Sequence, residues 1–364
     1  MSNKMTKQPF FSIVMPVYQA ETYIRKIIEC IQEQTFSDWE LIAVVDCSPD
    51  KSGEILEQYA KRDERIKVVN LKENMGVSEA RNRGIAHAQG RYLWFVDADD
   101  AVERTALKAC YDSLSANPAK LLIFGLIEEY YTSDGKLAYR NPRCPEEKVF
   151  RSKEELRPYM IYLEQQTLYG YPWNKVYDLT YLKEINVRFT DYRTNKFIED
   201  ITFNIEYCMN IDSLNLLAIT PYRYAKRSKD SLTNEFAAEY YALHKRRIEL
   251  LLEQYRYWRM VTEEVKKILG SLYARYILSA LQRNCDKRAE MTHTMRLKWC
   301  KGVFEQELFH LLIPAAEAKD SKALSIALLL LKKRHTRGCL ALGRLIYIVK
   351  NKLPMFYSKV KSKR

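Results

Sequence analysis

Two aspartates, Asp97 and Asp99, stand directly after the apolar run 92–96 with one residue between them. Carboxylate oxygens are the ligands that Mg²⁺ and Mn²⁺ prefer, and such an ion often lies between one or two carboxylates and a diphosphate. There it would act as a Lewis acid on a departing diphosphate. The pair alone also allows a plainer interpretation, because aspartates that follow a strand often cap the next helix.

Two other apolar runs end in residues that suit a nucleobase. The run 11–15 continues into Pro16 and Tyr18, and the run 41–45 is followed by Asp46. An aromatic ring can stack on a base, and a carboxylate can accept a hydrogen bond from its donor edge. The alternative for Tyr18 is an aromatic side chain packed beside the sheet.

A further acidic pair, Glu199 and Asp200, precedes the apolar positions Ile201, Ile205 and Cys208, whose spacing predicts a helix. Asp200 is then either a base that takes a proton from a hydroxyl group or the N-cap of that helix. The two roles are compatible, because a helix N-terminus is a rigid place to hold a carboxylate.

The elements that must position these residues alternate along residues 10–125. Short apolar runs predict buried strands at 11–15, 41–45, 66–69, 92–96 and 121–124, and helical patterns fill 21–34, 53–61, 78–88 and 103–117. Gly90 stands where a glycine often ends a helix. The alternation predicts an α/β fold with a mostly parallel sheet flanked by helices, in which ligands bind at the carboxyl ends of the strands.

Later residues indicate a different organisation. Residues 126–232 are mixed, and from about residue 236 three long amphipathic helical patterns follow. With 364 residues and 47% apolar side chains, the chain is long enough for two packed units. We expect an α/β domain over 1–232, a helical region over 233–320 and a basic amphipathic tail over 321–364.

The net charge of +13 is concentrated in the tail. Residues 321–364 contain twelve Lys or Arg and no Asp or Glu, while the first 320 residues are almost neutral. Such a segment predicts contact with an anionic membrane surface; the alternative is a basic helix packed on the protein body. Nucleic acid is not an expected partner, because no recognisable reading motif is present.

Three features predict a cytoplasmic protein, peripheral at most on the inner face of the membrane. The longest apolar run, 323–331, is too short to cross a bilayer, and residues 1–9 lack the apolar core of a signal peptide. The eight cysteines are scattered, as in proteins with reduced thiols.

Several spaced motifs in residues 10–115 resemble the family 2 glycosyltransferases of GT-A fold, and the likeness continues more thinly through 173–175, 199–204 and 222–224. Beyond about residue 235 no resemblance is recognised. The motifs are IVMPVY at 13–18, QTFSDWE at 34–40, DCSPD at 46–50, NMGVSEARNRG at 74–84 and DADD at 97–100.

The resemblance implies a nucleotide site. Pro16 and Tyr18 would line the base pocket, and Asp46 would accept the imide N–H of uracil. The family usually shows two adjacent acids at the end of that strand, and Val45 replaces the first of them here. Cys47 stands where glycine is common in the family. Both departures from the family pattern fall in the segment that would contact the base.

The resemblance also assigns the reacting groups. Asp99 would bind the metal ion directly, and Asp97 would contact the ribose or the metal. Arg81 would assist the diphosphate, with a surface ion pair as the alternative. Asp200, beside Glu199, would take the proton of the acceptor hydroxyl group.

Trp173 and Asn174 look like a loop on the acceptor side, with a core tryptophan as the alternative. Taken together, the residues and the resemblance predict a hexosyltransferase of polysaccharide biosynthesis. It would move a sugar from a nucleotide diphosphate donor, a UDP-sugar, to a glycan or lipid-linked saccharide. The transfer would be a metal-assisted single displacement with inversion.

Two alternatives remain open. A sugar-nucleotide nucleotidyltransferase uses a similar sheet, but generally carries a Gly-rich loop after the first strand, where this chain has Pro16, Val17 and Tyr18. A non-catalytic binding protein of the same fold is the other alternative, and the intact aspartates argue against it.

Overall fold

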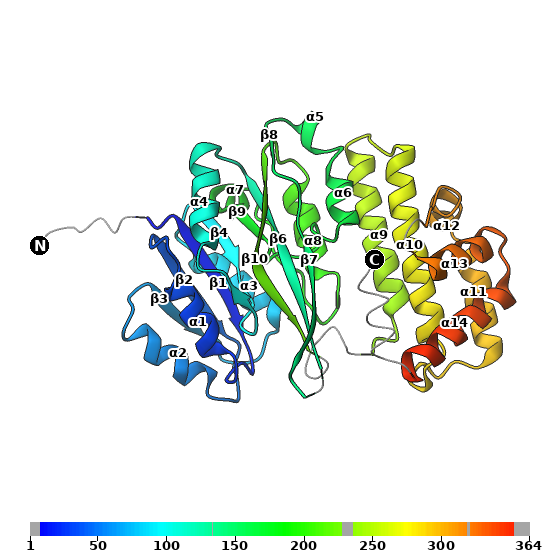
Figure 1. Ribbon diagram of the computed structural model, residues 1–364, viewed down its shortest axis with the longest axis horizontal. Helices are drawn as coiled ribbons and strands as arrows, with labels where there is room; N and C mark the ends of the chain where they lie inside the picture. The colour runs from blue at the N-terminus through cyan, green and yellow to red at the C-terminus, as the bar shows by residue number, and fades with distance from the viewer. Residues whose placement is uncertain (1–7, 133, 228–235, 319–320, 353–364) are drawn as a thin grey trace, which may run out of the picture. The chain divides into compact units, whose positions relative to one another are not determined.

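The computed structural model describes residues 8–132, 134–227, 236–318 and 321–352. The chain divides into two compact units, residues 1–234 and 235–364. The first unit is built on a ten-stranded sheet flanked by helices, and the described part of the second unit is helical (Figure 1).

The first half of the sheet is parallel and buried. Its strands are β1 (Phe11–Val17), β2 (Trp39–Val45), β3 (Ile66–Asn70) and β4 (Tyr92–Phe95), in the order β3-β2-β1-β4. Because β1, β2 and β4 are almost wholly buried, apolar residues occupy both faces of each strand, as their continuous apolar runs predict. Helices α1 (Ile24–Gln32), α2 (Ser52–Ala60), α3 (Val77–His87) and α4 (Ala106–Ala116) connect or follow these strands.

The predicted α/β fold with a helical C-terminal region is confirmed, and beyond β4 the strands change direction, so that the sheet as a whole is mixed. β9 (Lys175–Asp178) lies between β4 and β6 (Leu121–Tyr131), antiparallel to both, while β10 (Leu214–Lys226) is parallel to β6. Three further strands pair antiparallel with this part of the sheet: β5 (Ala101–Val102) and β8 (Lys148–Phe150) with β10, and β7 (Leu137–Arg143) with β6. The short helices of this region are α5 (Lys153–Leu156), α6 (Met160–Gln165), α7 (Leu179–Glu184) and α8 (Glu199–Cys208). The mixed pattern of residues 126–232 therefore supplies the antiparallel strands.

Gly90 is required for a close approach between chain segments rather than for a left-handed helix end. A Cβ atom at this position would lie 2.6 Å from the backbone nitrogen of Ser12 and 2.8 Å from its Oγ. The Ser12 hydroxyl oxygen accepts a hydrogen bond from the Gly90 N–H, and the hydroxyl donates to Glu40. The glycine thus lets the chain that enters β4 lie against β1.

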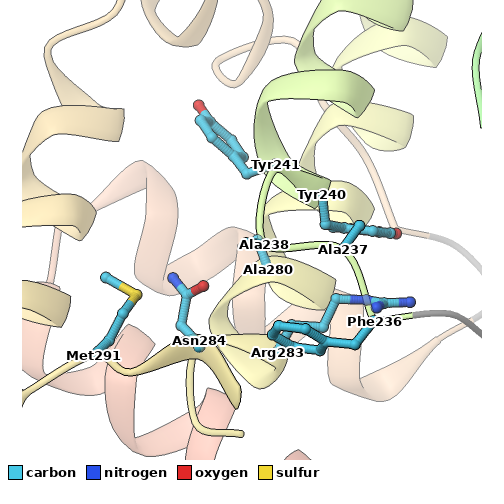
Figure 2. Close-up of a pocket in the computed structure, with 10 residues that line it drawn as sticks. Phe236, Ala237, Ala238, Tyr240, Tyr241, Ala280, Arg283, Asn284 and Met291 are labelled. Atoms are coloured by element: carbon cyan, nitrogen blue, oxygen red, sulfur yellow. The ribbon is translucent and has the colours of Figure 1, made fainter. Parts of the chain in front are cut away.

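The second unit contains α9 (Tyr240–Tyr257), α10 (Glu263–Arg283), the 3₁₀ helix η2 (Lys287–Ala289), α11 (His293–Phe304), α12 (Glu307–Leu312), α13 (Lys322–Lys332) and α14 (Thr336–Lys352). Buried side chains run the length of α10, which contacts α9, α12, α13 and α14. A small pocket of this unit lies where Arg283 of α10 covers the ring of Tyr240 at 4.1 Å (Figure 2).

The described part of the basic tail folds onto the second unit. Leu324, Leu328 and Leu331 of α13 are buried, and so are Cys339 and Gly343 of α14. Among the described residues, no helix combines the length and apolarity needed to cross a membrane.

Candidate active site

The carboxyl ends of β1, β2 and β4 lie at one edge of the sheet, because these strands are parallel neighbours. Pro16 lies within β1, and Tyr18 follows the strand with 48% of its surface exposed. Tyr18 is therefore not packed beside the sheet, and its ring is accessible to a ligand at this edge.

Asp46 lies at the end of β2 but is buried, with both carboxylate oxygens engaged. They accept hydrogen bonds from the backbone N–H groups of Met75 (2.7 Å) and Gly76 (2.8 Å). Gly76 has φ +87° and directly precedes α3, so the carboxylate fixes the turn from which α3 starts. The structure thus shows Asp46 holding the backbone turn at the start of α3, and its contact with the base stays a prediction.

The turn after β4 is tied to β10 through Asp100. This buried carboxylate accepts hydrogen bonds from the Tyr222 hydroxyl group (2.8 Å) and the Ala225 N–H (2.9 Å). The same Tyr222 oxygen accepts a hydrogen bond from the Asp97 N–H (3.0 Å). Two residues outside the predicted site therefore hold the backbone that carries Asp97 and Asp99.

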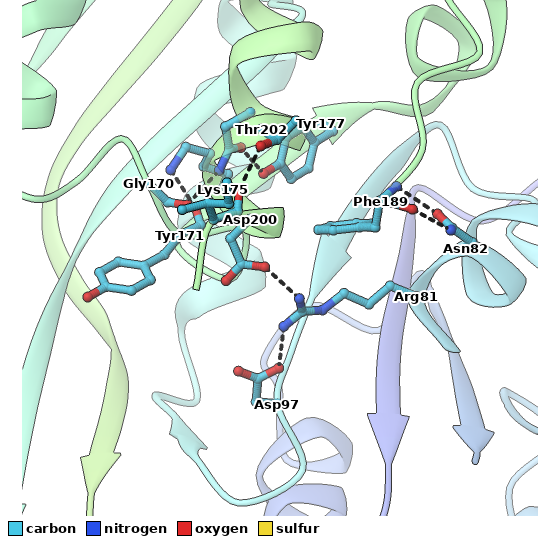
Figure 3. A network of polar contacts seen from close by, with 12 residues as sticks. Arg81, Asn82, Asp97, Gly170, Tyr171, Lys175, Tyr177, Phe189, Asp200 and Thr202 are labelled. Carbon is cyan, nitrogen blue, oxygen red and sulfur yellow. Dashed lines mark hydrogen bonds and ion pairs between the residues drawn. The ribbon is translucent and has the colours of Figure 1, made fainter. Parts of the chain in front are cut away.

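Arg81 joins the predicted nucleotide side to the predicted base (Figure 3). Its Nη1 donates to Asp200 Oδ1 at 2.6 Å, and its Nη2 donates to Asp97 Oδ1 at 3.2 Å. Burial alone would lower the pKa of Arg81, but the carboxylates of Asp200 and Asp97 raise it. Arg81 is thus neither a surface ion pair nor exposed for a diphosphate, because its two terminal nitrogens bridge two carboxylates.

Arg81 and Asp200 are held by packing on either side. Asn82, the neighbour of Arg81 on α3, exchanges two hydrogen bonds of 2.9 Å with the backbone of Phe189. The Phe189 ring lies under the Arg81 guanidinium group at 5.1 Å and stacks on Phe203 of α8. The approach of α3 to α8, and with it the Arg81–Asp200 contact, is therefore fixed by the core.

Glu199 and Asp200 occupy the first turn of α8, and Asp200 connects this helix to Arg81. Asp200 is not the N-cap, since the cap is Ile198 and Asp200 is the second residue of the helix. Burial raises the pKa of Asp200, Arg81 opposes this shift, and the charge of Asp97 adds to it.

Glu199 differs from Asp200 in having no cation at hydrogen-bond distance among the residues that the structure describes. Burial, together with the neighbouring Asp200 charge, raises the pKa of Glu199 to about 8. Its Oε2 atom is buried and has no hydrogen-bond partner among the residues described. Burial therefore favours the protonated form of Glu199, whereas Arg81 stabilises the ionised form of Asp200, the form that a base at this position requires.

Asp99 pairs with Arg227, a residue that the sequence analysis missed. Arg227 follows β10, and its Nη1 and Nη2 atoms lie 2.7 Å from Asp99 Oδ2 and from the Asp99 carbonyl oxygen. Partial burial, together with the nearby Asp97 carboxylate, raises the pKa of Asp99. The basic pair of Lys226 and Arg227 at the end of a strand was the available signal.

Trp173 and Asn174 lie in the core, so the structure does not support their predicted position facing an acceptor. The Trp173 ring stacks between Tyr222 (4.6 Å) and Tyr171 (4.7 Å), and the buried Asn174 amide donates to two backbone carbonyl groups. Tyr171 at the end of this aromatic stack is only partly buried, and its ring points away from the Asp200 carboxylate (Figure 3).

The residues present fit a divalent ion that shares its ligands with a diphosphate. Within the described ranges, no three Asp, Glu, His or Cys side chains converge as a complete metal site. Asp99 and Asp97 nevertheless offer hard oxygen ligands, and the raised pKa values of Asp99 and of the neighbouring Asp100, caused by burial and mutual repulsion, indicate excess negative charge. A cation would relieve that repulsion, with phosphate oxygens completing its coordination.

Comparison with known proteins agrees with this fold. Residues 12–185 match the family model described as glycosyl transferase family 2. The chain is 32% identical over 225 residues to the uncharacterized glycosyltransferase EpsJ of Bacillus subtilis, covering 62% of this chain and 63% of EpsJ. It is 26% identical over 232 residues to the poly(ribitol-phosphate) β-N-acetylglucosaminyltransferase TarS of Staphylococcus aureus (strain MW2), covering 63% of this chain and 38% of TarS.

The solved structure of S. aureus TarS residues 1–349 has the same fold, with a TM-score of 0.61, 18% sequence identity and coverage of 94% of this chain and 91% of that one. In sequence, the chain spans less than two thirds of the length of EpsJ and TarS. The structure has the α/β fold of the TarS fragment. Residues 12–185, nearly half of the chain, are similar to the family 2 glycosyltransferases.

Proposed function

We propose that this protein transfers a sugar from a UDP-sugar to a hydroxyl group of a glycan or lipid-linked saccharide, in a single displacement that inverts the anomeric carbon. The observation that carries the proposal is the Arg81 bridge, which places Asp97 and Asp200 on one guanidinium group. Asp97 belongs to the turn after β4, which we propose binds the nucleotide, and Asp200 belongs to α8 and is the proposed base. The Arg81 bridge therefore joins the proposed nucleotide site to the group proposed to accept the proton.

Support for the donor and acceptor comes from the relatives. The solved TarS fragment has been crystallised with UDP and with UDP-GlcNAc, and another relative is the putative teichuronic acid biosynthesis glycosyltransferase TuaG of B. subtilis. We therefore propose a hexosyl donor carried by UDP and an acceptor in the synthesis of a cell-surface polysaccharide. The predicted peripheral membrane location also stays a proposal.

In the proposed reaction, Asp200 takes the proton of the acceptor hydroxyl group as that oxygen attacks the anomeric carbon. Arg81 orients this carboxylate, while burial and the Asp97 charge keep it basic enough to accept a proton. Glu199, protonated at neutral pH, adds no second charge beside it. Asp99 and Asp97 would hold Mn²⁺ or Mg²⁺, which would supply neutralisation of the leaving diphosphate.

The experiment that tests the proposal pairs transfer with donor binding. The chain is incubated with a panel of nucleotide sugars, with and without Mn²⁺, and thermal stability and sugar release are measured. A ligand that binds the native state raises its melting temperature by mass action. We expect a Mn²⁺-dependent shift with UDP-sugars and transfer to saccharide acceptors.

The matched variant is Asp200→Asn. It should keep the UDP-dependent shift in melting temperature and lose transfer by about 10²-fold or more, because proton transfer by a positioned group contributes that much. Unchanged transfer by this variant would contradict the assignment of the base. Formation of a nucleotide sugar from a nucleoside triphosphate and a sugar phosphate would instead identify a nucleotidyltransferase.

A further inference from the structure

Helices α13 and α14 each expose a pair of large apolar side chains. Ile326 and Leu329 of α13 are 50% and 56% exposed, and Leu345 and Ile348 of α14 are 58% and 39% exposed. Residues three apart lie on the same side of a helix, so each pair forms a short apolar surface. We refer to these four residues as the apolar stripe.

The apolar stripe is separate from the apolar residues that fold the unit. The buried side of α13 is made by Leu324, Ala327, Leu328 and Leu331, none of which belongs to the stripe. In α14 the close contact is made by Gly343, where an added Cβ atom would lie 2.8 Å from the backbone of Leu281. The inward faces therefore account for the packing, and the outward apolar residues are left without a role in the core.

Basic side chains flank the apolar stripe on the same sides of the two helices. Lys322 and Lys333 are spaced four residues from Ile326 and Leu329, and both are exposed. Arg337 and Arg344 are exposed at positions eleven and four residues before Ile348. No acidic residue occurs anywhere in 321–364, so nothing within this segment neutralises these cations.

We propose that the outward faces of α13 and α14, with the apolar stripe at their centre, dock on an anionic membrane surface. The basic side chains complement acidic lipid headgroups, and the isoleucine and leucine side chains enter the boundary between headgroups and acyl chains. The charge pattern favours this occupant over a second copy of the chain, whose stripe would bring like charges together. A nucleic acid would match the cations but not the exposed apolar residues.

The proposal gives the helices two separate faces, one for folding and one for docking. It extends the proposed function by placing the enzyme where a lipid-linked acceptor is presented, but it does not depend on transfer activity. Lipid binding is measured on its own, so failure of the docking proposal and failure of the transferase proposal are distinguishable.

The test is co-sedimentation of the full chain with vesicles of phosphatidylcholine alone or with about 30% phosphatidylglycerol, at low and high salt. We expect binding to the anionic vesicles only, weakened by salt. The variants I326S/L329S and L345S/I348S, alone and combined, remove the apolar stripe. The variant R337Q/R344Q removes two cations and should weaken binding about tenfold, since each Lys or Arg near an anionic surface contributes several-fold.

Matched controls come from exposed residues elsewhere in the second unit. M295S/Y257S removes two exposed apolar side chains, and K298Q/K301Q removes two exposed cations of α11. These should bind vesicles like the original chain. All variants keep residues 353–364, so a difference is assigned to the helices.

Equal vesicle binding by the stripe variants and their controls would overturn the proposal, as would binding to neutral vesicles of equal strength. Loss of a dimer from the stripe variants in sedimentation equilibrium, with no vesicle binding by the original chain, would assign the surface to a second copy instead. Binding of the original chain to duplex DNA but not to vesicles would assign it to nucleic acid. Either result would also refute membrane docking.

Discussion

At the scale of single residues, the site depends on how three carboxylates are divided between two guanidinium groups. Arg81 forms ion pairs with Asp97 and Asp200, and Arg227 forms one with Asp99. Sequence reasoning named the three aspartates but not this distribution, because ion pairs between α3, α8 and β10 depend on how distant segments pack. Arg81 was predicted to contact the diphosphate; because it is buried between Asp97 and Asp200, we propose a positioning role for it instead.

Substitution of Arg81 by lysine tests that role. An ammonium group keeps the charge but cannot reach both carboxylates as a planar fork does. We expect kcat to fall about 10²-fold, since misplacement of a catalytic group has an effect of this order. The nucleotide Kd should stay within about threefold. With the fork lost, the pKa of Asp200 rises further, so the acidic limb of the pH–rate profile should move to higher pH.

The matched control for this substitution is Arg83→Lys. Arg83 lies on the same helix, is half-exposed, and pairs only with Glu79 at 2.7 Å among the contacts described. Its replacement should leave both kcat and the pH profile unchanged. An Arg81→Lys enzyme with normal kcat and profile would show that Arg81 serves the fold alone.

Glu199 gives a second prediction at the same scale. A carboxyl group whose pKa rises to about 8 on folding binds its proton more tightly in the folded state. The free energy of unfolding therefore falls as pH increases from the ordinary carboxyl pKa, about 4.3, to about 8. Glu199→Gln removes this titration and keeps the shape, so it should be more stable than the original chain at pH about 8.

The gain should be at least about 1.4 kcal/mol, the equivalent of one pKa unit, and should nearly vanish at about pH 3, below the carboxyl pKa of the unfolded chain. Urea unfolding at both pH values measures it, and the exposed Glu64→Gln provides the control. If the gain were the same at both pH values, the proton would not reside on Glu199.

At the scale of elements, the parallel half of the sheet could be predicted and the antiparallel half could not. Strands β1, β2 and β4 are apolar on both faces, which a continuous run reveals directly. The strand β9 is only four residues long and includes Lys175, whose buried ammonium group donates to the carbonyl oxygens of Leu168 and Tyr171. Its place between β4 and β6 is set by pairing with strands distant in the sequence, which a local sequence pattern does not reveal.

Gly90 supplies the prediction for this scale. Glycine was expected from helix-ending geometry, whereas the structure requires it because the backbone of β1 leaves no room for a Cβ atom. Gly90→Ala should destabilise the first unit by about 1–3 kcal/mol, the usual range for overpacking. The control is Gly302→Ala, where an added Cβ meets nothing within 4 Å. Calorimetry should show a lower melting temperature for the first variant alone.

At the scale of the whole molecule, the boundary of the basic segment does not coincide with the boundary between the two packed units. The composition places the basic excess in residues 321–364, and the structure assigns the described part of this segment to the core of the second unit. Composition could indicate an anionic partner, but it could not show that Leu324, Leu328 and Leu331 are buried by neighbouring helices. The inward faces of these helices therefore pack in the core, and we propose the membrane surface only for their outward faces.

This double use predicts the result of truncation. Deleting residues 321–364 removes three buried leucines, each contributing about 1.5–3 kcal/mol when buried, and uncovers the α10 surface around Leu281. The second unit should lose at least about 4 kcal/mol of stability or fail to fold, while the first unit keeps its nucleotide-dependent rise in melting temperature. Deleting only residues 353–364 preserves both helices and should leave calorimetric unfolding unchanged. Identical unfolding of the two truncated chains would mean that α13 and α14 contribute nothing to the core. A loss of vesicle binding on deletion of residues 321–364 would then reflect the missing segment itself and not unfolding of the second unit.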